Sequence, residues 1–181
     1  MRIKPFLRFT IFSIILMNAA VLKTISQENG KIEVKQIKAV QAIVIKADVP
    51  TSEISQKMGE LYAKLFGYLG QNQLQPAGPP FAVYLSFDPQ GNTVFETGIP
   101  VSKEIQGTDE YVFKVYPETK AVSTLYTGPY EKMEPVYTEL EKYMKDNNLK
   151  EKGTAVEVYL TDPSVVTDPN NYQTIVYFPV E

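Results

Sequence analysis

Carboxylates and tyrosines are the residues through which this chain could do chemistry, because it contains neither cysteine nor histidine. These absences exclude Ser-His-Asp and Cys-His nucleophilic catalysis, thiolate or imidazole zinc sites and disulfide bonds. The chain also lacks the Asp-x-Asp-x-Asp-Gly spacing of a calcium loop. A site for a hard cation made of carboxylates alone stays open but has no supporting motif, and we expect no metal and no cofactor. The chain has twelve tyrosines to place beside its carboxylates.

One carboxylate has neighbours that suit it to a binding site. It lies in the run Ala-Val-Glu-Val-Tyr-Leu that ends at Leu160. Period-two alternation places Glu157 and Tyr159 on one face of a strand, and Val156, Val158 and Leu160 on the other face, which we expect beneath the helices. A carboxylate beside aromatic rings can attract a cationic ligand. The alternative is a solvated carboxylate on the open face of a sheet.

The segment that holds Glu157 also has a counterpart earlier in the chain. Four short blocks recur in the same order: 38–40 at 120–122, 82–85 at 157–160, 88–89 at 162–163, and 99–101 at 178–180. The chain is therefore predicted to be a tandem duplication, with one copy at about 31–101 and the other at 110–181. Tyr84 is the counterpart of Tyr159, whereas Ala82 stands where Glu157 stands. We expect a cleft between the copies with two tyrosines and one central carboxylate.

Each copy is predicted to be a strand-helix-strand-strand module. In the first copy we expect a long strand over 31–46, a helix over about 17 residues from Ile54, and a hairpin over 81–101. In the second copy we expect a strand broken by a bend (111–116 and 121–126), a helix with its apolar stripe over 133–144, and strands at 154–161 and 174–180. The result is an α+β fold with antiparallel sheets in two layers and two covering helices.

Seven further tyrosines divide into two groups. Three stand close to the expected cleft, where they either line it or pack as ordinary amphipathic residues: Tyr126, Tyr130 and Tyr177. Four lie in or beside the helix stripes and are assigned to core or surface: Tyr62, Tyr68, Tyr137 and Tyr143. Glu96 falls on the hairpin of the first copy and is expected to be exposed.

The N-terminus has the layout of a secretory signal peptide. Arg2, Lys4 and Arg8 precede an apolar run over 9–22, and small residues follow, so residues 1–26 are predicted to be removed from a mature domain 27–181. A 14-residue run is short for a membrane-spanning helix of about 20 residues. An uncleaved membrane anchor is the alternative. Both readings place the domain outside the cytoplasm, in the periplasm or the extracellular space.

The net charge predicted for the mature domain makes nucleic acid an unfavourable partner. Residues 1–26 contain four basic and no acidic side chains, so their removal changes the formal net charge from -3 to -7. A domain this acidic should repel phosphate backbones.

Three longer motifs, taken together, resemble the GyrI-like small-molecule-binding family, which includes the effector-binding domains of multidrug-responsive bacterial transcription activators. They are Phe-Glu-Thr-Gly-Ile-Pro-Val at 95–101, Tyr-Thr-Gly-Pro-Tyr at 126–130, and Val-Glu-Val-Tyr-Leu-Thr-Asp-Pro at 156–163. The resemblance covers most of residues 35–181 and implies two strand-helix-strand-strand modules. It also implies that Glu157 is the central pocket glutamate, facing aromatic and often cationic ligands between tyrosine walls.

The chain departs from this family at two places that shape the pocket. Many members carry a bulky aromatic residue before the glutamate, where this chain has Val156, and many carry histidine where it has Tyr126. We expect a stand-alone exported domain that binds a small aromatic, amphiphilic or cationic compound. Two alternatives stay open: a hydrolase of strained electrophilic molecules that uses Glu157 as general acid, base or nucleophile, and a protein-interaction module.

Overall fold

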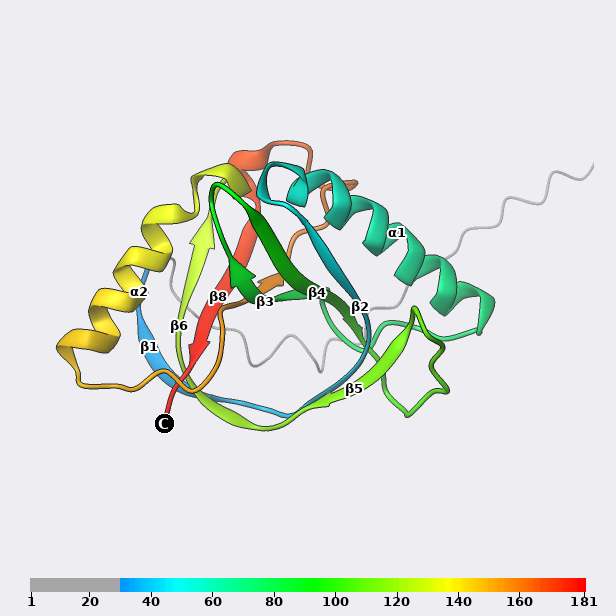
Figure 1. The fold of residues 1–181 in the computed structure, drawn as a ribbon, viewed down its shortest axis with the longest axis horizontal. Helices are drawn as coiled ribbons and strands as arrows, with labels where there is room; N and C mark the ends of the chain where they lie inside the picture. The colour runs from blue at the N-terminus through cyan, green and yellow to red at the C-terminus, as the bar shows by residue number, and fades with distance from the viewer. Residues whose placement is uncertain (1–29) are drawn as a thin grey trace, which may run out of the picture.

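The computed structural model describes residues 30–181 as a curled antiparallel sheet with two α-helices (Figure 1). The predicted signal segment lies outside these residues. The strands are β1 (Glu33–Ile37), β2 (Val40–Pro50), β3 (Phe81–Phe87), β4 (Asn92–Pro100), β5 (Val112–Tyr116), β6 (Thr119–Thr127), β7 (Val156–Tyr159) and β8 (Gln173–Pro179). The helices are α1 (Ile54–Gln71) and α2 (Glu134–Asp146), with short 3-10 helices η2 (Thr51–Glu53), η3 (Tyr130–Lys132) and η4 (Pro169–Asn171). None of the helices in the described part is long and apolar enough to cross a membrane.

The strand order places the two halves of the chain symmetrically. The strand order in the sheet is β1-β6-β8-β7-β3-β4-β2-β5. Each strand of the first half (β1, β2, β3, β4) stands as far from one edge as its counterpart in the second half (β5, β6, β7, β8) stands from the other edge. The strands β7 and β3 therefore meet at the centre, where Ala82 lies directly opposite Glu157 in the antiparallel register.

The predicted α+β class is confirmed, with two differences in the strands. All eight strands belong to one sheet instead of two layers. The stretch 31–46 is not one strand. It is divided into β1, which pairs with β6 at one end of the strand order, and β2, which pairs with β4 and β5 near the other end. The second half has the same break, between β5 and β6.

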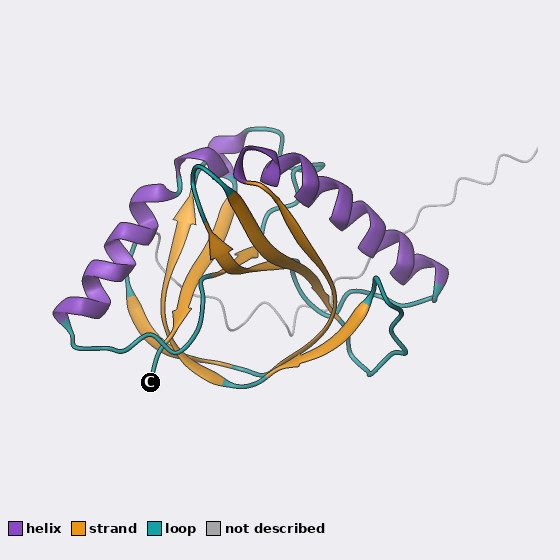
Figure 2. Ribbon diagram, viewed as in Figure 1, coloured by secondary structure: helices purple, strands orange, loops and turns teal. Residues whose placement is uncertain are grey.

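Both helices cover the outer face of the curled sheet (Figure 2). The apolar stripe of α1 buries Leu61, Leu65 and Leu69 in a cluster that includes Phe95. The stripe of α2 buries Leu140 and Met144 in a second cluster, and Pro135 is tolerated because it stands in the first turn, where a backbone N–H has no helical partner. Each helix therefore packs on its own half of the sheet and leaves the seam between β3 and β7 beneath both.

The inner face of the sheet is buried as well, and this overturns one prediction. Val156 belongs to a third cluster with Phe81 and Val83, against which Val158 packs. Glu157 and Tyr159 thus face the helices, and the valines do not. The prediction that Val156, Val158 and Leu160 lie beneath the helices was wrong in its choice of face.

The expectation that Glu96 is exposed was also wrong. Glu96 is 4% exposed, because β4 lies between β3 and β2 instead of at an edge. Its carboxylate accepts a hydrogen bond from the Tyr116 hydroxyl over 2.8 Å and forms an ion pair with Lys114. A buried carboxylate needs such partners.

Candidate ligand-binding site

Glu157 lies in a cage of tyrosine hydroxyls at the seam between the two halves. Its side chain is 3% exposed, on β7. Tyr84 of β3 donates to Oε2 over 3.2 Å, Tyr159 of β7 donates to the same oxygen, and Tyr137 of α2 donates to Oε1. Three elements therefore hold one carboxylate, and these donors supply the hydrogen bonds that a buried charge requires.

A second layer of side chains packs around Tyr159. The ring of Tyr62, from α1, meets it edge-on with centroids 6.0 Å apart, and the ring of Tyr130, from η3, does so at 5.5 Å. The Tyr159 hydroxyl also lies 3.3 Å from the sulfur of Met58. Tyr62 is fixed in turn by donating to the carbonyl of Phe81 over 2.8 Å. Both helices and both central strands thus contribute to the walls.

The electrostatics of the cage favour neutral tyrosines and act on the pKa of Glu157 in opposite directions. Burial raises the pKa of Glu157, and the hydrogen bonds from Tyr137, Tyr159 and Tyr84 oppose that rise. Burial, with Glu157 nearby, also raises the pKa of each of these three tyrosines. The hydroxyls therefore stay protonated and remain hydrogen-bond donors.

The cage is asymmetric within a symmetric frame. Ala82, which is fully buried, lies across the seam from Glu157 at the equivalent place in the other half. One half therefore has a carboxylate at this place and the other half has none. A second carboxylate there would lie directly opposite Glu157, where like charges repel. Ala82, Tyr84 and Glu157 lie on the same face of the sheet.

The structure brings some of the predicted site residues together and separates others. Glu157, Tyr84 and Tyr159 are in mutual contact, and Tyr130 reaches the cage through the ring of Tyr159. Tyr177 does not, because it packs against the inner-face cluster on the opposite side of the sheet.

Tyr126 supports the turn before α2 instead of the cage. Its hydroxyl donates to the carbonyl of Pro129 over 3.0 Å. Gly128 between them has φ of 151°, and a Cβ there would come within 2.4 Å of the Tyr126 hydroxyl. This turn requires glycine, and it positions Tyr130 at the start of η3.

Sequence reasoning missed two residues of the cage, Tyr137 and Tyr62. Both were assigned to core or surface because they fall in or beside the helix stripes. That signal was correct but incomplete: a tyrosine on a buried stripe needs a partner for its hydroxyl, and Glu157 and the Phe81 carbonyl are those partners.

Comparison with known proteins identifies the class. The family model of the GyrI-like small molecule binding domain matches residues 30–181. The chain belongs to this family. No curated protein matches it closely enough to count as a relative.

Solved structures share the fold at low sequence identity. The EcmrR C-terminal domain is 22% identical with a TM-score of 0.70, over 83% of this chain and 97% of that one. In the EcmrR–DNA complex the matched part is 57% of the EcmrR chain, so this chain spans little more than half of that regulator. A hydrolase from Listeria innocua is 13% identical with a TM-score of 0.66, over 90% and 98% of the two chains. SAV2435 bound to tetraphenylphosphonium is 15% identical with a TM-score of 0.54, over 83% and 94%.

Proposed function

We propose that this protein is an exported domain that binds a small aromatic or amphiphilic cation at Glu157. The observation that carries the proposal is the carboxylate itself, 3% exposed and held by three tyrosine hydroxyls at the seam of the two halves. Burying a carboxylate is costly. A cationic ligand would supply a positive charge beside it, which the three tyrosine hydroxyls do not. Tyrosine faces would add about 0.5–2 kcal/mol each by cation–π attraction.

The burial of Glu157 sets a condition on binding. A ligand that touches the carboxylate has to displace at least one tyrosine side chain, since they cover it now. Hydrolysis would need more than this displacement, because a general base must reach both the substrate and a water molecule. The structurally similar SAV2435 is seen with tetraphenylphosphonium, a lipophilic aromatic cation, which makes that compound a suitable first probe.

Thermal denaturation of the full chain with matched cationic, neutral and anionic aromatic compounds tests the proposal. A ligand at about 100 times its dissociation constant stabilises the protein by about 2.7 kcal/mol, which a raised melting temperature reveals. We expect stabilisation by cations, and its loss in Glu157→Gln. Equal responses in the wild type and the variant would refute the role of Glu157. Turnover of a bound compound would favour the hydrolase alternative.

A further inference from the structure

The open side of β2 forms a groove that is separate from the Glu157 cage. Strand β5 pairs with β2 only along residues 40–44, so within residues 30–181 no strand lies beside the rest of β2 on that side. A groove of about 410 Å³ occupies this place. The strand edge, α1 and the segment before β5 line it, including Ile45, Lys46, Asp48, Leu61 and Asp109.

The backbone of β2 turns hydrogen-bonding groups toward this groove. The amide of Val101 donates to the carbonyl of Gln41 over 2.9 Å, so Gln41 directs its carbonyl to the β4 side. In an antiparallel ladder, successive residues direct their N–H and C=O groups to alternate sides. The N–H and C=O of Lys46 and Asp48 therefore point into the groove. Such an edge is a template for another strand.

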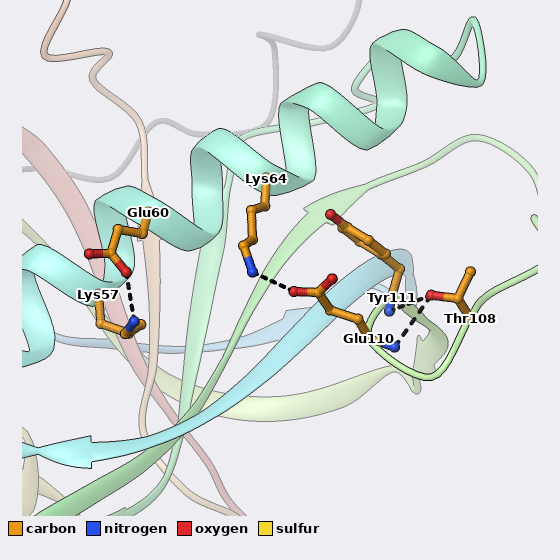
Figure 3. A network of polar contacts seen from close by, with 6 residues as sticks. All are labelled: Lys57, Glu60, Lys64, Thr108, Glu110 and Tyr111. Carbon is orange, nitrogen blue, oxygen red and sulfur yellow. Dashed lines mark hydrogen bonds and ion pairs between the residues drawn. The ribbon is translucent and has the colours of Figure 1, made fainter.

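The far wall of the groove is fixed to α1 by a polar network (Figure 3). Lys64 of α1 forms an ion pair with Glu110 at 2.6 Å. The Thr108 hydroxyl accepts from the amides of Glu110 and Tyr111 at 3.3 and 3.1 Å. The Tyr111 ring stacks on Tyr68 with centroids 4.2 Å apart. The segment before β5 is thus held against the helix, beside the edge of β2.

We propose that this groove binds an extended peptide segment of another protein as an antiparallel strand along β2. A peptide residue opposite Ala47 would direct its side chain toward the apolar side of the groove, which includes Leu61. Residues opposite Asp48 and Lys46 would lie beside these exposed charges, and opposite charges across a strand pair are favourable. The peptide segment that fits therefore has a basic, an apolar and an acidic residue in this order from its N-terminus, opposite Asp48, Ala47 and Lys46.

A second copy of this chain fits the groove less well. Its own β2 offers Lys46, Ala47 and Asp48 in the required order. In the register that pairs these opposite charges, however, the copy's Pro50 would fall opposite Val44, a place that Val112 already occupies. Shifting the register to avoid this clash would put Asp48 opposite its own counterpart, where like charges repel.

Fluorescence anisotropy with end-blocked, labelled peptides and the full chain tests the proposal. We expect Thr-Lys-Val-Glu-Thr to bind about tenfold more tightly than Thr-Glu-Val-Lys-Thr, because both cross-strand charge pairs reverse sign. The double variant Lys46→Glu with Asp48→Lys should reverse this preference. Because Lys46 lies opposite Glu96 and Asp48 accepts a hydrogen bond from Asn92, the two peptides are compared at a temperature at which the variant is folded. N-methylation of the peptide glutamate should abolish binding, whereas N-methylation of the valine should not, because its N–H points away from β2.

Several outcomes would overturn the peptide site. They are equal affinity for both peptides, insensitivity to the position of the methyl group, or a wild-type dimer that the single substitution Lys46→Glu dissociates by setting two acidic side chains opposite each other. None of these outcomes depends on Glu157, so this test and that of the small-molecule site fail independently.

Discussion

The Glu157→Gln substitution removes a carboxyl group whose pKa is raised by burial in the folded protein. Such a group holds its proton more tightly when folded. Its contribution to stability is fully present below the unfolded pKa of about 4.3 and is lost as the pH rises through the folded-state pKa. Within that window, the free energy of unfolding of the wild type should fall by up to about 1.4 kcal/mol per pH unit relative to the variant.

Urea denaturation of both proteins between about pH 4 and pH 8 measures this difference directly. The difference in the free energy of unfolding should grow in favour of Glu157→Gln as the pH rises. Glu139→Gln, which removes an exposed carboxylate from α2, is the matched control and should run parallel to the wild type. Parallel curves for Glu157→Gln as well would mean that the pKa of Glu157 does not rise on folding, and would refute the view that burial outweighs the tyrosine hydrogen bonds.

Three further substitutions test the contacts that build the site. Tyr137→Phe removes one hydrogen-bond donor from the buried carboxylate of Glu157, which should lower the free energy of unfolding in urea denaturation by about 1–3 kcal/mol. No loss would mean that this hydrogen bond does not form. Ala82→Glu places a second carboxylate opposite Glu157, so its melting temperature should fall sharply as the pH rises, and a pH-independent change would contradict the register of β3 and β7. Gly128→Ala should lower the free energy of unfolding by about 1 kcal/mol or more in the same assay, because φ is 151° and an added Cβ would collide with the Tyr126 hydroxyl. An unchanged free energy of unfolding would contradict the geometry of this turn.

The sequence could predict which residues share a face, but not which face the helices cover. Alternation along β7 correctly separates Glu157 and Tyr159 from Val156 and Val158. Because the curled sheet buries both faces, Val156 is as inaccessible as Glu157, and apolarity no longer marks the helix side. The predicted repeat was the more useful signal, since it paired Tyr84 with Tyr159, and the structure places both hydroxyls on Glu157.

Residues whose surroundings come from distant segments could not be placed from the sequence. Glu96 was predicted to be exposed on a local hairpin, but β5, which pairs with β2, brings Lys114 and Tyr116 to it from later in the chain. Tyr137 occupies a helical stripe position like those of its apolar neighbours. Only the packing of α2 over the central seam shows that its hydroxyl reaches Glu157.

Isothermal titration calorimetry of the full chain with tetraphenylphosphonium, at several pH values and in buffers of different ionisation enthalpy, tests the central claim most directly. A cation that pairs with Glu157 should bind more tightly as the pH rises, and should release a proton wherever the free carboxyl is protonated. Both effects should disappear in Glu157→Gln. Binding of equal affinity and equal proton release in the wild type and the variant would contradict the account.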